Sequence, residues 1–170
     1  MPNTKRITRK SPVARTAGGR RAYLRHATTP PASPVQESAR ILGIPASDSS
    51  TLIRQVRKGL PFETLERLQQ AYSLSTNEIV TLVQIPTRTM TRRKESGRLK
   101  AGESDRVLRA ARLMHRAAAL FNNDPGAAKT WMTTPQRGLG GAVPLELAGT
   151  EIGAREVEDA LGRIEDGIFA

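Results

Sequence analysis

Residues 74–99 read LSTNEIVTLVQIPTRTMTRRKESGRL, and this stretch predicts two helices joined by a tight turn. The first helix begins at Ser75, because Ser75 and Glu78 have the spacing of a capping box, in which each side chain accepts a hydrogen bond from the other residue's backbone N–H. Apolar residues follow at positions i, i+3 and i+4, which places them on one face. These residues are Ile79, Leu82 and Val83. The first helix is therefore expected to pack against a core behind it.

Pro86 separates the two helices. Proline has no backbone N–H and biases the residue before it away from helical geometry, so the first helix ends before Pro86. Thr87 is the expected N-cap of the second helix, Met90 its one apolar anchor and Gly97 its end. The rest of the second helix is polar, so most of its surface is expected to stay outside the core.

The second helix and its flank carry the predicted DNA contacts. In a basic helix behind a tight turn, side chains can reach base edges in the major groove while neighbouring cations hold phosphates. A run of basic residues also occurs on helix faces that meet only solvent, but the cap, the turn and the apolar anchor favour DNA. We predict base and phosphate contacts from Arg88, Thr89, Arg92 and Arg93, and phosphate contacts from Lys94 and Arg98.

The net charge of +11 is unevenly distributed along the chain. Residues 1–34 hold eight basic residues and no acidic one, and residues 84–116 hold ten basic and three acidic residues. Residues 117–170, in contrast, hold four basic and eight acidic residues. A polyanion attracts the two basic regions and repels the acidic one, so the C-terminal region is expected to bind a different partner.

Residues 1–34 are predicted to form a disordered basic arm. They combine Arg and Lys with Ser, Thr, Gly and Pro and show no apolar periodicity, so they bury too little surface to offset the entropy of ordering. Four interpretations stay open: a DNA-binding arm, an organellar transit peptide, a segment without a specific role, and a true start codon further downstream.

The composition excludes several classes of site. The 170 residues contain no cysteine, which excludes disulfides, zinc–thiolate sites and cysteine nucleophiles and is typical of a reducing cytoplasm. The two histidines, His26 in the arm and His115 beside Arg116, are expected to have surface roles, so we predict no catalytic site, no metal and no cofactor. No apolar run approaches the roughly 18 residues that a membrane span requires, so we expect no membrane partner.

The remaining apolar residues also follow the helical period, so we predict an all-α fold. Further helices are expected to begin at Ser50, Pro61, Ser104, Pro125 and about Ala154. In the helix that begins at Ser50, Leu52, Ile53 and Val56 are expected on one core-facing side. We divide the chain into the arm (1–34), a helix-turn-helix domain (35–103), a connecting helix (104–122) and a C-terminal domain (123–170).

Three groups of residues resemble a known family. Residues 88–99, RTMTRRKESGRL, followed by residues 104–109, SDRVLR, look like the helix-turn-helix of Xre-type antitoxins. The other two groups lie in the C-terminal region and together resemble the toxin-binding domain shared by the Xre, MbcA and ParS antitoxins. They comprise Ala128, Trp131, Pro135, Leu139, Gly140, Gly141, Pro144 and Leu145, and then Gly153, Val157, Leu161, Arg163, Ile164 and Gly167.

This resemblance implies a type II antitoxin whose residues 123–170 form the toxin-binding domain. Such proteins neutralise a RES-domain toxin, an enzyme that consumes NAD, and repress their own operon in the bacterial cytoplasm. The implied partners are the cognate RES-domain toxin and operator DNA, and a homodimer is also expected. The residues expected to contact the toxin are Leu139, Gly140, Gly141, Val157, Leu161, Ile164, Gly167, Ile168, Phe169 and Ala170.

Two other functions compete with this interpretation. A stand-alone dimeric transcriptional regulator, whose C-terminal domain only dimerises, would share every feature of the N-terminal half. An enzyme is less favoured, because no paired acid and base and no metal cluster is visible in the sequence.

Overall fold

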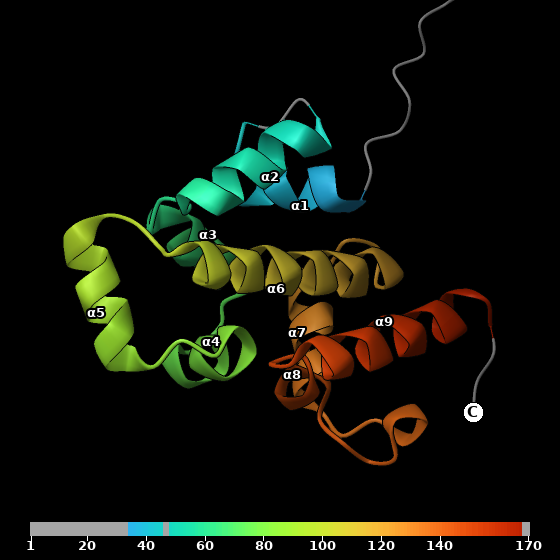
Figure 1. Cartoon of the computed structure of the whole chain (residues 1–170). Helices are drawn as coiled ribbons and strands as arrows, with labels where there is room; N and C mark the ends of the chain where they lie inside the picture. Colours follow the sequence, from blue (N-terminus) through green and yellow to red (C-terminus); the bar gives the residue numbers. More distant parts are fainter. Residues whose placement is uncertain (1–33, 46–47, 168–170) are drawn as a thin grey trace, which may run out of the picture. The chain divides into compact units, whose positions relative to one another are not determined.

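The computed structural model describes residues 34–45 and 48–167, and this part of the chain consists of helices and connecting turns (Figure 1). The helices are α1 (Pro34–Ile41), α2 (Ser49–Lys58), α3 (Glu63–Ala71), α4 (Thr76–Val83), α5 (Thr87–Ser96), α6 (Ala101–Leu120), α7 (Pro125–Thr133), the 3-10 turn η1 (Arg137–Leu139), α8 (Pro144–Leu147) and α9 (Glu151–Glu165). The predicted all-α fold is confirmed. Residues 1–33 of the predicted arm lie outside the described residues. None of the described helices is both long enough and apolar enough to cross a membrane.

Helix α6 is the central element of the described chain. It packs against α1, α2, α3 and α4, and also against α7 and α9 (Figure 1). Small side chains allow this close packing, because Ala110, Ala111 and Ala117 are buried and let neighbouring helices approach the α6 backbone. Larger buried side chains on the same helix, such as Val107 and Met114, fill the space between its neighbours. A single helix therefore contributes to the packing of both halves.

One hydrophobic core runs through the described residues. It extends from Ala39 in α1 to Leu161 in α9 and includes Leu82 of α4 and Leu145 of α8. Helices α4 and α8 also contact each other directly. The predicted domain boundaries stay predictions, but the packing shows no break where the last of them was placed, after residue 122.

The start of α6 differs from the expected one. Ser104 was expected to cap this helix, but the helix begins at Ala101 and the Glu103 carboxylate accepts a hydrogen bond from the Lys100 backbone N–H at 2.7 Å. Ser104 is buried one turn inside the helix, where its hydroxyl accepts from the Leu60 N–H at 2.8 Å and donates to the Lys100 carbonyl at 2.8 Å. The reason is tertiary: Ser104 satisfies a backbone donor of another segment instead of a helix end.

Three other helices also begin at residues that differ from the predicted ones. In α2, Asp48 replaces Ser50 as N-cap and accepts a hydrogen bond from the Thr51 N–H at 2.8 Å. Helix α3 begins at Glu63 instead of Pro61, and α9 begins at Glu151 instead of about residue 154, because Thr150 caps it. The start of α7 is confirmed: Pro125 is its first residue and Asp124 caps it.

The side of α2 that was expected to face the core is only partly buried. Leu52 is buried and Val56 is half-buried, but Ile53 is 51% exposed. Residues at positions i, i+1 and i+4 span a wider arc of the helix surface than the helices packed against α2 cover. The prediction of Ile53 as a core residue is therefore wrong.

Three ion pairs hold α9 along α6. Each joins an arginine of α6 to a glutamate of α9, and the glutamates are spaced seven residues apart, so they repeat on one side of the helix. The pairs are Arg109–Glu151 at 2.9 Å, Arg112–Glu158 at 2.5 Å and Arg116–Glu165 at 2.9 Å. The hydrogen bond from Arg109 lowers the pKa of the Glu151 carboxyl. We refer to these pairs as the α6–α9 ladder.

Candidate nucleic-acid interface

The first helix of the predicted motif begins as expected. The Ser75 hydroxyl accepts a hydrogen bond from the Glu78 N–H at 3.2 Å, and the Glu78 carboxylate accepts one from the Ser75 N–H at 2.6 Å, which confirms the capping box. Lys129 of α7 reaches this cap, because its ammonium group lies 3.1 Å from Glu78 and donates to the Ser73 carbonyl at 2.7 Å. Burial alone would raise the pKa of Glu78, but the hydrogen bonds from Ser75 and Lys129 lower it. The C-terminal half thus supports the start of α4.

The turn between α4 and α5 is held by contacts on both of its sides. Gln84 adopts the left-handed conformation, with φ of 51°, and ends α4, while Ile85 is fully buried. The Arg106 guanidinium of α6 donates to the Val83 carbonyl at 2.8 Å and thereby satisfies a carbonyl at the helix end. Helix α5 starts directly after Pro86, which takes the N-cap position expected for Thr87. Gly97, with φ of 70°, ends α5 as expected.

The exposed face of α5 is defined by residues at positions i, i+3, i+4 and i+7. These are Arg88, Thr91, Arg92 and Glu95, all of which are exposed, whereas Met90 and Arg93 are buried on the opposite side. Arg88, Arg92 and Glu95 form no hydrogen bond or ion pair with the rest of the described chain. Their charged groups are consequently available to a ligand. We refer to these four residues as the α5 stripe.

The α5 stripe has the chemistry for reading base edges. Arginine can donate two hydrogen bonds to guanine, the threonine methyl group can contact thymine, and a glutamate carboxylate can accept from the amino group of cytosine. Thr91 and Glu95 were not among the residues predicted to bind DNA. Their spacing from Arg88 would have indicated them, since positions i, i+3 and i+7 share one helix face. Thr89, which was predicted, is half-buried at the edge of this face.

Arg93, one of the predicted DNA contacts, is not available to DNA. Its side chain is buried, with 9% of its surface exposed, and it pairs with Glu103 of α6 through two hydrogen bonds of 2.7 and 2.9 Å. Burial alone would raise the pKa of Glu103, but the hydrogen bonds from Arg93 and from the Lys100 backbone lower it. A guanidinium held in this way positions α5 on α6 and cannot reach DNA at the same time. We therefore remove Arg93 from the contacts.

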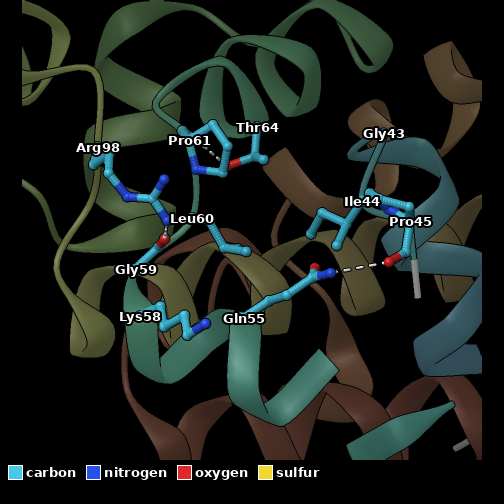
Figure 2. Close-up of a pocket in the computed structure, with 10 residues that line it drawn as sticks. All are labelled: Gly43, Ile44, Pro45, Gln55, Lys58, Gly59, Leu60, Pro61, Thr64 and Arg98. Carbon is cyan, nitrogen blue, oxygen red and sulfur yellow. Dashed lines mark hydrogen bonds between the residues drawn. The ribbon is translucent and has the colours of Figure 1, made fainter. Parts of the chain in front are cut away.

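Lys94 and Arg98, the two predicted phosphate contacts, are exposed but have partners. The Lys94 ammonium lies 2.8 Å from Glu66 of α3, and 69% of its side chain remains exposed. The Arg98 guanidinium donates to the Gly59 carbonyl at the end of α2 (Figure 2). A surface ion pair contributes little free energy, so Lys94 can exchange Glu66 for a phosphate with little loss of stability. Lys94 lies on α5 outside the stripe, and Arg98 follows the end of α5.

A pocket of about 230 Å³ adjoins Arg98 (Figure 2). Its wall is largely apolar and includes Ile44, Leu60 and Pro61. Across the pocket, the Gln55 amide donates to the Pro45 carbonyl at 2.9 Å. The pocket thus separates the end of α2 from the segment after α1, and Arg98 lies at its edge.

In the C-terminal half, two of the predicted toxin contacts are core residues. Val157 and Leu161 have no exposed surface, because α9 packs this side against α6. Both predictions are therefore wrong. Leu139 and Ile164 are half-buried, and Leu139 packs against the edge of the core.

The exposed residues of the predicted toxin site lie on a glycine loop and at the end of α9. Gly140 and Gly141 are exposed, both with positive φ, and a Cβ at either position would meet no other atom within 4 Å. Arg163 of α9 donates to the Gly138 carbonyl at 3.1 Å and so joins the last turn of α9 to this loop. Gly167 is exposed beyond α9. Residues 168–170, which complete the predicted site, lie outside the described residues.

Comparison with known families divides the chain within α6. Residues 51–112 match the family described as antitoxin Xre-like helix-turn-helix domain. Residues 116–167 match the family described as antitoxin Xre/MbcA/ParS C-terminal toxin-binding domain. The first match contains the α5 stripe, and the second contains the glycine loop and α9.

Curated relatives match over most of the chain. A protein named antitoxin Xre from Yersinia enterocolitica serotype O:8 / biotype 1B is 39% identical over 151 residues, which cover 88% of this chain and 99% of the relative. A second, from Photorhabdus laumondii subsp. laumondii, is 36% identical over 132 residues, or 77% of this chain and 89% of the relative. A third, from Pseudomonas putida, is 36% identical over 84 residues, 49% of this chain and 52% of the relative.

Proposed function

Since the chain belongs to the Xre family of type II antitoxins, we propose that it neutralises a RES-domain, NAD-consuming toxin and represses its own operon. The match of residues 116–167 to a toxin-binding domain carries the first half of this proposal. The same family indicates a regulator without enzymatic activity. Its partners would be the toxin, operator DNA and a second copy of the chain, in the bacterial cytoplasm.

The DNA half of the proposal rests on the α5 stripe. Arg88 and Arg92 are exposed and unpaired within the described chain, so no bond has to break before they contact bases or phosphates. Thr89, at the edge of the stripe, is retained as a contact, and Lys94 and Arg98 are proposed to hold phosphates on either side. The Arg93–Glu103 pair keeps α5 in place on α6, so the stripe is presented on a fixed helix.

The toxin half rests on the exposed surface of the C-terminal half. We propose that Gly140, Gly141, Ile164 and Gly167 contact the toxin, together with residues 168–170, and that Leu139 lies at the edge of this contact. Glycines that carry no side chain and meet no neighbour allow a partner's backbone to approach closely. The Arg163 bond to the glycine loop supports one continuous surface.

The proposal is tested by co-expression with the gene immediately downstream, with cell growth and NAD content as readouts. The full chain is expected to restore both. A chain that ends at Glu165 is expected to restore neither, although it should fold, since the last fully buried residue of α9 is Leu161. The matched variant Arg88→Ala/Arg92→Ala should neutralise the toxin but lose repression of a reporter placed behind the operon's promoter.

Three results would contradict the proposal. If the downstream product does not lower NAD, the RES-domain assignment fails. If the chain ending at Glu165 protects as well as the full chain, the residues after α9 are not part of the toxin contact. If the full chain does not protect, a stand-alone regulator becomes the better description.

A further inference from the structure

The pocket beside Arg98 has the composition of a small-molecule site (Figure 2). Its volume is about 230 Å³, and its largely apolar wall includes Ile44, Leu60 and Pro61. Pockets that bind small molecules combine such a wall with a few polar groups that orient the ligand. This pocket is smaller than those that hold drug-sized molecules, so it suits a short ligand.

The charged side chains that line the pocket in the described chain are both basic. They are Lys58, at the end of α2, and Arg98, which follows α5. Both are exposed, and Lys58 forms no hydrogen bond or ion pair with the rest of the described chain. Figure 2 shows the two cations on one side of the pocket, across from Ile44 and Pro45. The pocket thus has an apolar part and a cationic part.

The other polar groups of the pocket already have partners. The backbone N–H groups of Ile44, Gly59 and Leu60 all donate within the chain. The Gln55 amide and the Thr64 hydroxyl also donate to backbone carbonyls. A ligand with many polar groups, such as a sugar, would leave several of them unpaired here, which is costly. The two cations are therefore the groups that remain to orient a ligand.

The backbone around Arg98 is fixed to the wall of the pocket. The Leu99 N–H donates to the Leu60 carbonyl at 2.9 Å, and the Phe62 N–H donates to the Gly97 carbonyl at 3.0 Å. These bonds pair the wall with the residues that directly follow α5. Arg98 consequently belongs both to the edge of the pocket and to the flank of α5.

We propose that this pocket binds a small amphipathic carboxylate. The hydrocarbon body of the ligand lies against Ile44, Leu60 and Pro61. Its carboxylate accepts charge-assisted hydrogen bonds from Lys58 and Arg98. A neutral alcohol of the same length would gain only the apolar contact, and an amine would meet like charges.

The ligand would also regulate DNA binding, and this second step alone rests on the proposed function. Arg98 is proposed above to hold a phosphate. A guanidinium that pairs with the ligand carboxylate is withdrawn from that phosphate. Ligand and operator therefore compete for Arg98, and each lowers the affinity of the protein for the other.

Hexanoate is the probe for the site, and backbone amide NMR signals of the full-length chain, without DNA, are the readout. The signals of Ile44, Leu60 and Thr64 are expected to shift as hexanoate is added. 1-Hexanol, which has the same chain length without the charge, is expected to bind about fivefold more weakly or worse. Acetate, which has the charge without the chain, is expected to leave these signals in place.

Two variants test the assigned cations. Lys58→Met and Arg98→Met are each expected to raise the dissociation constant of hexanoate about two- to fivefold, the effect of one exposed ion pair. Arg57→Met is the matched control, because it removes the same charge from the neighbouring position of α2, outside the pocket wall. It should bind hexanoate like the wild type. Thermal unfolding of each variant checks that the fold is intact.

Several results would overturn the site. Pocket signals that do not move with hexanoate would do so, as would equal affinities for hexanoate and 1-hexanol. Wild-type affinity in both Lys58→Met and Arg98→Met, or an equal loss in Arg57→Met, would show that the two cations do not bind the carboxylate.

The regulatory step is tested by fluorescence anisotropy on operator DNA. Hexanoate is expected to weaken operator binding about two- to fivefold relative to acetate at the same concentration, and to have no such effect on Arg98→Met. If hexanoate binds but the operator affinity does not change, the regulatory step is overturned and the site stands. If the wild type does not bind the operator at all, the DNA half of the proposed function fails, and the NMR titration still decides the site.

Discussion

Arg92 and Arg93 are adjacent in α5 but are held in different ways. Arg92 is exposed and unpaired within the described chain, whereas Arg93 is buried against Glu103. We predict that Arg92→Ala weakens operator binding by about 1–3 kcal/mol and leaves the melting temperature unchanged. Arg93→Ala should instead lower the melting temperature by several degrees, because it leaves the Glu103 carboxylate without its cation.

Fluorescence anisotropy on operator DNA and thermal unfolding, applied to both variants, separate these effects. The two substitutions remove the same charge from neighbouring positions, so each serves as the control for the other. Equal losses of DNA affinity, with equal melting temperatures, would contradict the assigned roles.

The sequence predicted an exposed basic face on the second helix of the motif, but not which arginine is exposed and which is buried. Arg93 follows Met90 by three residues, and that spacing already places both on one helix face. What the spacing could not show is the partner, because Glu103 lies ten residues further on, beyond the end of α5, and reaches Arg93 only in the folded chain. A buried arginine and a ligand-binding arginine therefore look alike until their neighbours are known.

Among the helices, the contact between α5 and α6 is expected to be sensitive to acid. The pKa of Glu103 is lower in the folded chain than its usual value, so folding favours the ionised carboxylate. The stabilisation is fully present above the pKa of the unfolded chain, about 4.3, and is lost as the pH falls through the lower pKa of the folded state. We predict that the free energy of unfolding of the wild type falls more between pH 7 and pH 3 than that of Glu103→Gln.

Urea titrations of both proteins at several pH values measure this difference. Glu78 and Glu151 also have lowered pKa values, so both proteins lose stability in acid, and only the difference between them reports on Glu103. Parallel pH dependences would show that the Arg93–Glu103 pair does not contribute.

Helix boundaries were predictable where local contacts set them. The capping box of α4 and the Asp124–Pro125 start of α7 are formed by neighbours in sequence, and both were predicted from the sequence. The start of α6 was not, because Ser104 is the better N-cap by type but bonds to Leu60, 44 residues earlier. The α6–α9 ladder was missed for the same reason, since its partners are more than 40 residues apart.

At the scale of the whole molecule, the salt dependence of DNA binding tests how many of its cations contact phosphates. With Arg93 withdrawn, four cations on and beside α5 remain for phosphates or bases: Arg88, Arg92, Lys94 and Arg98. If about four phosphates are neutralised per protomer, the logarithm of the binding constant should fall against the logarithm of salt concentration with a slope of roughly −3 to −4 per protomer. A slope near zero in an anisotropy titration would be incompatible with DNA binding by this surface.

The order of the two halves could be predicted from the sequence, because charge and motifs change along it. The core that the two halves share could not be predicted, since it depends on which faces of helices far apart in sequence pack together. The predicted connecting helix illustrates this: the helical period of its apolar residues was recognised, but not that α1, α2, α7 and α9 would all pack around it.

The shared packing around α6 bears on how long the protein acts in a cell. A cellular protease that unfolds the chain from its C-terminal end would first strip α9 from α6, the helix against which α4 also packs. Under the proposed function, the two halves would lose their packing together, so no long-lived fragment would keep the operon silent after the toxin is released. Removal of the protein would start toxin activity and renewed synthesis of its own messenger RNA at the same moment.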